Sequence, residues 1–207
     1  LVGIYFLSPD IDEADASGWM KSNQDTPFFR KITSTLFRKP YFSRANDELG
    51  FRNQIENFYY RMSDVTHTKG VEFSHRRLAD PGGVTFNETT FRELLAVLED
   101  ADSLVATAFV LHSPVLFVPL PVSEKFGLNR PVSGFYEEGQ VNFLRKMLDP
   151  KTVRVLDEIS AADPDAQSVK EHFASLPDIT DDQIQEQIRR DEEFMQRFKP
   201  PRGMESP

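Results

Sequence analysis

The chain has 207 residues, of which 39% are hydrophobic and 28% charged, and its formal net charge is −9. These values are typical of an ordinary globular protein, and the length is sufficient for one domain with its own core. The sequence has no cysteine, which excludes disulfides and thiolate zinc sites and favours a cytoplasmic protein. No run of 18 or more apolar residues occurs, so we expect no membrane span. The chain begins with Leu1, and we expect its true N-terminus to lie further upstream.

Apolar residues recur at helical spacing in five segments, and the third covers about six turns of one helix. In chain order, the five stripes are Phe28, Phe29, Ile32 and Leu36; Phe51, Ile55, Phe58, Met62 and Val65; Phe91, Leu94, Leu95, Leu98, Ala101, Val105, Ala108, Phe109 and His112; Val153, Leu156 and Ile159; and Ile184, Ile188, Met195 and Phe198. We therefore expect an all-α domain over residues 1–198, arranged as an array of about six to eight helices. Residues 199–207 are expected to form a flexible tail.

Five pairs of a side-chain acceptor and a proline predict where helices begin. The acceptor would cap free backbone N–H groups, and proline suits the first helical position because no donor is needed there. The pairs are Ser8-Pro9, Thr26-Pro27, Ser113-Pro114, Asp149-Pro150 and Asp163-Pro164. Thr180 and Gln183 predict a capping box at the start of the last helix.

Two segments depart from the helical pattern. Residues 113–133 contain four prolines among apolar residues, which excludes a long helix and a central strand. We expect an irregular insert there, buried as a connector across the core rather than exposed as a lip that receives a ligand. Residues 71–73 and 84–86 alternate as two short strands would, but we expect an ordered loop because an isolated hairpin is only marginally stable.

The run NFYYRMSDVTH, residues 57–67, is the strongest candidate for chemistry. An arginine and a histidine at the end of an aromatic-rich helical stretch could build a charged catalytic pocket. The spacing of Arg61 and His67 resembles the R-x4-6-H signature of HEPN-type ribonucleases, small helical domains that cleave RNA without a metal. The resemblance implies that Arg61 stabilises the phosphate charge and that His67 takes part in proton transfer. The basic and aromatic residues 28–44 could attract RNA and stack on its bases. On one continuous helix the two side chains lie on different flanks, so catalysis requires a helix break near Ser63 or a dimer.

A second resemblance favours a structural role for the same residues. FYYRMSDVTHTKG is similar to a Y-x-x-L-S-D-x-x-H box in bacterial helical proteins of unknown function. In physical terms, Ser63 and Asp64 compete for backbone donors and are expected to end the helix. His67 would then hydrogen-bond back to the helix or to Asp64. We prefer this interpretation to catalysis.

Polar and aromatic residues near this box are candidates for binding. They are Tyr60, Ser63, Asp64, His75, Arg76 and Arg77. The two arginines could contact a phosphate. Asp64, His67 and His75 could offer metal ligands, but no histidine pair at i, i+4 and no well-spaced further carboxylate accompany them. We therefore expect no metal and no cofactor.

Charge is segregated along the chain. Residues 28–44 contain five bases and no acid, whereas acids outnumber bases in residues 157–193. The acidic part could dock on the basic part of a second copy or of the same chain. We therefore expect a non-catalytic helical binding module that associates with a protein partner or with its own copy. The alternative is a metal-independent ribonuclease that uses Arg61 and His67, and RNA is a partner only in that case.

Overall fold

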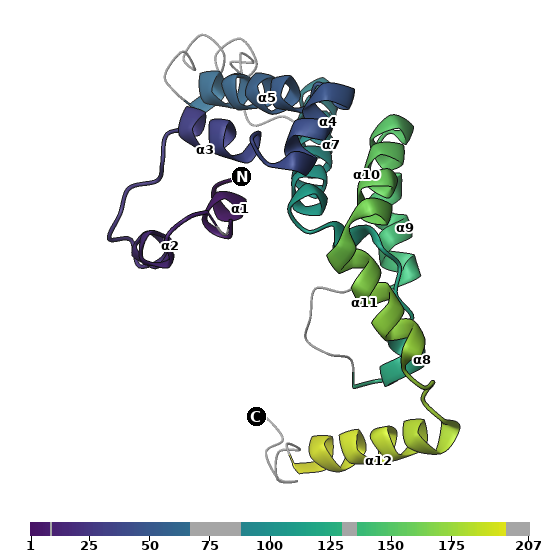
Figure 1. Cartoon of the computed structure of the whole chain (residues 1–207). Coiled ribbons are helices and arrows are strands. Elements are labelled where there is room, and N and C mark those ends of the chain that lie inside the picture. The colour runs from purple at the N-terminus through teal and green to yellow at the C-terminus, as the bar shows by residue number, and fades with distance from the viewer. Residues whose placement is uncertain (9, 67–87, 130–135, 198–207) are drawn as a thin grey trace, which may run out of the picture.

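The protein is built from α-helices, as the computed structural model shows (Figure 1). It describes residues 1–8, 10–66, 88–129 and 136–197. Within these ranges there are eleven α-helices, one 3-10 helix and no strand, which confirms the all-α prediction. The number exceeds the expected six to eight because α1 and α8 have only five residues and α2 has no apolar face, so these three helices leave no periodic signal.

The elements follow one another in a simple order. They are α1 (Val2–Phe6), α2 (Glu13–Met20), α3 (Phe29–Leu36), α4 (Pro40–Leu49), α5 (Phe51–Thr66), α7 (Glu88–His112), the 3-10 helix η1 (Pro114–Phe117), α8 (Val122–Phe126), α9 (Glu138–Lys146), α10 (Pro150–Ala162), α11 (Pro164–Ser175) and α12 (Asp181–Arg197). The two strand-like segments at residues 71–73 and 84–86 and the predicted tail at residues 199–207 lie outside the described residues.

Two of the acceptor-proline pairs cap α-helices as predicted. The Asp149 carboxylate accepts from the backbone N–H groups of Lys151 and Thr152, at 2.9 and 3.1 Å, at the start of α10. The Asp163 carboxylate accepts from the backbone N–H of Ala166 at 2.7 Å and caps α11. The capping box of α12 is also confirmed, since Thr180 and Gln183 bond reciprocally through side chain and backbone.

The other pairs do not start α-helices. Ser113-Pro114 begins the short 3-10 helix η1 without a side-chain cap. The prediction for Thr26-Pro27 is wrong because α3 begins at Phe29, and the Thr26 hydroxyl instead accepts from the Trp19 indole at 3.1 Å. The prediction for Ser8-Pro9 is also wrong, since the Ser8 hydroxyl donates back to the carbonyl of Ile4.

The main core lies where α1, α3, α4, α5, α7, η1 and α10 meet. Its largest fully buried side chains are Leu36, Phe42, Phe51, Phe117 and Leu156. A smaller cluster joins the segment after η1 to α11 through Val118, Leu120, Val122, Ala166 and Phe173. The proline-rich insert is therefore a buried connector as expected, over the part of residues 113–129 that supplies these side chains.

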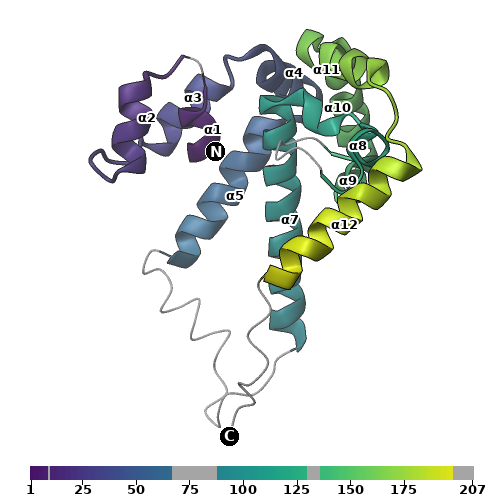
Figure 2. The same ribbon diagram turned by 90° about the horizontal axis from the view of Figure 1, so that it is seen from below.

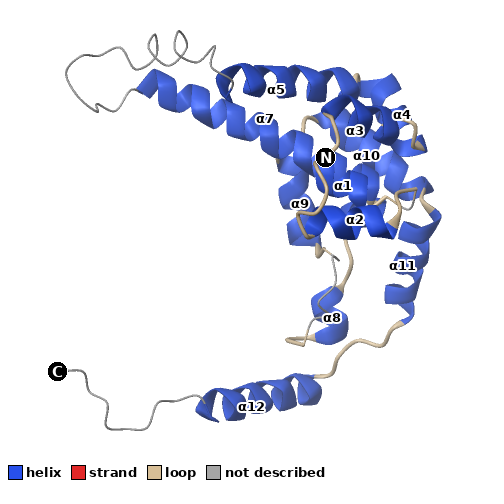
Figure 3. Ribbon diagram, turned by 90° about the vertical axis from the view of Figure 1, so that its left-hand side faces the viewer, coloured by secondary structure: helices blue, strands red, loops and turns tan. Residues whose placement is uncertain are grey.

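The last two turns of α7 enter the main core, but most of the helix lies outside it. Ala108, Val110 and Leu111 are buried, whereas Phe91, Leu94 and Leu98 are about half exposed. The predicted helix over these residues is confirmed, and its apolar face is buried only near its C-terminal end. Figures 2 and 3 show α5 and α7 side by side as they extend from the body.

The last helix, α12, extends from the opposite end of the molecule and on the same side as α5 and α7 (Figure 3). Its first turns are fixed to the segment around α8, where the Gln187 side chain donates to the carbonyl of Phe126 at 3.0 Å. The backbone N–H of Leu128 donates to Gln187 at 2.8 Å. Among the described residues, no helix combines the length and apolar character needed to cross a lipid bilayer.

The carboxylate of Asp163 is predicted to be a strong local contributor to stability. One oxygen caps α11 and the other accepts from the Tyr41 hydroxyl at 2.6 Å. Replacing Asp163 with Ala should lower the free energy of unfolding by about 2–4 kcal/mol, and Tyr41→Phe by about 1–2 kcal/mol. Urea denaturation measures both. Glu171→Ala, on the exposed face of α11, is the control and should change stability by less than about 0.5 kcal/mol. An Asp163→Ala effect no larger than the control would contradict the assigned cap.

The same hydrogen bond predicts a loss of stability in alkaline solution. The bond to Asp163, followed by burial and the negative charges of Asp163 and Asp165, raises the pKa of Tyr41 to about 12. An unfolded tyrosine ionises near pH 10. Because the folded pKa is raised, this contribution is complete below about pH 10 and is lost as pH rises to about 12. The difference in unfolding free energy between wild type and Tyr41→Phe should therefore shrink between about pH 10 and 12, and a difference that grew would refute the bond.

Candidate functional site

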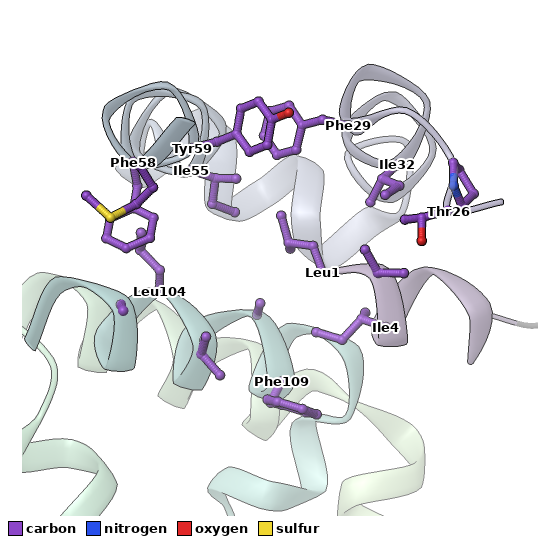
Figure 4. Close-up of a pocket in the computed structure, with 16 residues that line it drawn as sticks. Leu1, Ile4, Thr26, Phe29, Ile32, Ile55, Phe58, Tyr59, Leu104 and Phe109 are labelled. Carbon is purple, nitrogen blue, oxygen red and sulfur yellow. The ribbon is translucent and has the colours of Figure 1, made fainter. Parts of the chain in front are cut away.

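An apolar cavity of about 420 Å³ lies between α7 and the facing helices α1, α3 and α5 (Figure 4). One wall comes from α7, with Ala101, Leu104, Val105 and Ala108. We call this cavity the α5–α7 groove. Among the described side chains that line it, none is charged, and the polar groups are the hydroxyls of Thr26 and Tyr59. The groove therefore suits an apolar occupant.

Helical spacing explains both walls of the groove. On α5, Ile55, Phe58 and Met62 follow the i, i+3, i+7 pattern, which places them on one face. On α7, Ala101 and Ala108 are seven residues apart and stand in line on the facing wall. The space exists because these two alanines are short, whereas larger side chains at the same positions would fill it.

Aromatic stacking holds α3 against α5 at the edge of the groove. The rings of Phe29 and Tyr59 stack with centroids 3.8 Å apart and an interplanar angle of 4°. The ring of Tyr60 meets Phe29 edge-on at 6.5 Å. Such ring pairs contribute about 0.5–1.5 kcal/mol beyond the area they bury. The facing helices are therefore fixed in position before any ligand arrives.

The exposed apolar surface of α7 continues beyond the groove. We call it the α7 stripe, and it consists of Phe91, Leu94, Leu95, Leu98, Val105 and Phe109. These side chains are 42–52% exposed. At about 100° per residue they fall within an arc of about 100°, and the stripe is about 27 Å long. The stripe and the groove-lining side chains of α7 share one side of the helix, and at helical spacing the exposed Asp102 stands within the stripe, between Leu98 and Val105.

The arginine of the predicted catalytic pair is engaged on the outer side of this site. The Arg61 guanidinium lies 2.6 Å from the carboxylate of Asp100 and 5.3 Å from the ring centroid of Phe58. Both members of the ion pair are about half exposed, so the pair contributes at most about 1 kcal/mol. Its position shows that Arg61 joins α5 to α7 here. His67 lies outside the described residues, so the distance between the predicted catalytic groups is not defined.

The helix that carries the box does not end where the sequence suggested. We expected Ser63 and Asp64 to terminate it, but α5 continues through both residues to Thr66. The prediction is wrong because serine and aspartate cost only a few tenths of a kcal/mol in a helix interior, which packing overrides. A break near Ser63, which would bring Arg61 and His67 together on one chain, is absent.

The remaining predicted binding residues divide into two groups. Tyr60 is half exposed beside Phe29 and borders the groove, and Ser63 lies one turn further along α5. The side chain of Asp64 and all of His75, Arg76 and Arg77 lie outside the described residues. Within the part of the chain that the structure describes, no three histidine, aspartate or glutamate side chains are grouped to hold a metal.

The histidine at the end of α7 is not part of the groove. Burial, followed by the positive charge of Lys39, lowers the pKa of His112, which favours the neutral ring.

The apolar stripes of α5 and α7 are evident from the sequence, but the groove between them is not. The alanines at 101 and 108, within a row of larger residues, are the signal that could have indicated a hollow.

Comparison with known proteins gives no relative for this chain. No protein-family model matches it, and no match is found among curated proteins or solved structures. The two resemblances drawn from residues 57–70 therefore stay predictions.

Two neighbouring substitutions on α7 should separate the exposed surface from the core. Val105 is 52% exposed and Ala108 is 2% exposed. We expect Val105→Asp to change the free energy of unfolding by less than about 1 kcal/mol, because its carboxylate remains in water. Ala108→Asp should cost more than about 3 kcal/mol, because it buries an unpaired charge. Urea denaturation measures the free energy of unfolding of both variants. Equal losses of that free energy would mean that the α7 stripe is covered in solution.

Proposed function

We propose that this chain is a helical binding module whose α5–α7 groove and α7 stripe receive an amphipathic helix of a protein partner. The observation that carries the proposal is the row of six large apolar side chains left half exposed on one face of α7. Single exposed apolar residues are common on protein surfaces, but six large ones on one helix face, interrupted by Asp102, are typical of an interaction site. We place the module in the cytoplasm as part of the proposal, since a chain without cysteine is suited to a reducing compartment.

The shape of the surface favours a helix over a small molecule. A volume of about 420 Å³ could hold a small apolar ligand, but such a ligand would leave Leu94 and Leu98 exposed. A helix of about 18 residues has the length of the whole stripe. Its side chains at i, i+3, i+4 and i+7 would pack along α7 as helices pack in other apolar grooves.

The walls of the groove support binding rather than catalysis. Their only polar side-chain groups among the described residues are two hydroxyls, and Thr26 already accepts a hydrogen bond from Trp19. A nucleophile with a neighbouring base is not assembled there. For the ribonuclease alternative, the cation that would stabilise a phosphate, Arg61, is paired with Asp100. No observation within the described residues favours that alternative, so we do not propose it.

A designed peptide tests this function without knowledge of the natural partner. The probe is a fluorescent amphipathic helix of about 18 residues, with leucines at i, i+3, i+4 and i+7 and equal numbers of lysine and glutamate elsewhere. We expect fluorescence anisotropy to show binding to the wild type, with affinity at least about tenfold weaker in Leu98→Asp, because a carboxylate would be desolvated in the contact.

Two controls make the result specific. Phe143→Asp changes a side chain of α9 that is 65% exposed and remote from α7 in sequence, and it should bind the peptide as the wild type does. A peptide of the same composition with scrambled order should bind to none of the proteins. Equal binding to the wild type and to Leu98→Asp, or no binding to either, would reject the proposed groove function.

A further inference from the structure

We propose that the helix received by the α7 stripe carries a cation, arginine or lysine, that pairs with Asp102 in the middle of the contact. The pairing rests on the proposed function, since it names the chemistry of the partner that the same surface takes. Asp102 has this role because of its position on α7, its unpaired carboxylate and the apolar side chains around it.

Asp102 stands in the middle of the apolar row of α7. At about 100° per residue, it falls inside the arc of about 100° that the α7 stripe covers. It is seven residues from Leu95 and seven from Phe109, which is about 10 Å along the helix axis in either direction. Both of these side chains belong to the stripe, and the side chain of Asp102 is itself exposed. A helix that covers the stripe from Leu95 to Phe109 must therefore pass over or beside this carboxylate.

The carboxylate of Asp102 takes part in no hydrogen bond or ion pair among the described residues. Its neighbours on the surface of α7 cannot supply one. The residues at i−4, i−3, i+3 and i+4 are Leu98, Glu99, Val105 and Ala106, in that order. None of them is a cation, and Glu99 is a second exposed carboxylate. The charge of Asp102 is therefore stabilised by water at this position.

The arginines of the neighbouring turns are already engaged. Arg92 lies 2.7 Å from Glu88, one turn earlier on α7, and Arg61 of α5 lies 2.6 Å from Asp100. Asp100 is about 160° around α7 from Asp102, so the Arg61 guanidinium belongs to the opposite side of the helix. Neither arginine is available to Asp102, and a partner helix can supply the cation instead.

Covering the stripe removes Asp102 from water, so the partner has to replace the lost hydration. An unpaired carboxylate within an apolar contact opposes association strongly. A cation on the partner offsets that loss, and a pair of opposite charges also fixes the register in which two helices lie. Arginine suits the position best, because its planar guanidinium can donate two parallel hydrogen bonds to one carboxylate. Leucine or glutamate at the facing position is disfavoured, and Asp102 thereby selects among amphipathic helices.

The overall charge of the chain favours the same kind of partner, but less specifically. At a net charge of −9, the chain attracts any basic helix at long range and speeds the encounter. That attraction is screened over about 8 Å at physiological salt, whereas an ion pair enclosed by apolar side chains is screened much less. Added salt therefore separates pairing with Asp102 from the general attraction.

A peptide series tests the pairing. Its parent is the designed helix described above, and in each derivative one leucine of the apolar face is replaced by arginine or by glutamate. Replacing each leucine in turn removes the need to know the register of docking. In about 0.5 M salt, we expect fluorescence anisotropy to show, at one position, binding of the arginine derivative to the wild type at least about tenfold tighter than that of the glutamate derivative.

Variants of Asp102 assign the preference to this residue. In Asp102→Leu, the ratio between the two derivatives should fall below about threefold, and the parent peptide should bind more tightly than it does to the wild type. Asp102→Asn, which removes the charge and keeps the size, should lose the arginine preference as well. Glu171→Leu makes the same change of charge on the exposed face of α11 and should bind every peptide as the wild type does. Circular dichroism confirms that the variants remain helical.

The outcomes distinguish this pairing from the proposed function. If Leu98→Asp weakens binding of the parent peptide but no derivative discriminates arginine from glutamate, the groove function stands and the pairing is wrong. An arginine preference that persists unchanged in Asp102→Leu and Asp102→Asn also overturns the pairing. If no peptide of the series binds to the wild type, both proposals are wrong. A preference that is present in the wild type and lost in both variants of Asp102 supports both.

Discussion

Burial of the last turns of α7 is the constraint on which the arrangement of the other helices depends. Val110 and Leu111 lie in the main core, where α7 packs against η1, α4 and α10. Because a helix of 25 residues behaves as a rigid rod, fixing its end in the core also fixes the direction of the remainder. Its first turns are consequently held outside the body and reach past the end of α5 (Figure 2). Leu94 and Leu98 on this part of the helix are about half exposed.

The groove results from this constraint and from the two short side chains at positions 101 and 108 of α7. Stacking of Phe29 on Tyr59 holds α3 to α5, and the ion pair of Arg61 with Asp100 joins α5 to α7. These contacts set the walls, while the short side chains of Ala101 and Ala108 leave the space between them. The interior of a protein is normally packed as densely as a crystal of small molecules, and a cavity lowers the stability of the fold. A cavity with fixed walls is therefore expected either to receive a ligand or to have its lost packing energy offset by other contacts.

The sequence predicted the elements of this protein better than their burial. Helical periodicity identifies α5, α7 and α12, and aspartate before proline identifies the starts of α10 and α11, because both signals are local. Periodicity alone does not show whether an apolar face is covered, so the half exposure of the α7 stripe could not be predicted from the sequence. Thr26 fails as a cap because its hydroxyl bonds to Trp19, a contact seven residues away that competes with capping. Leu1 and Ile4 line the groove because the fold brings α1 against α7, and no local pattern in the sequence predicts that contact.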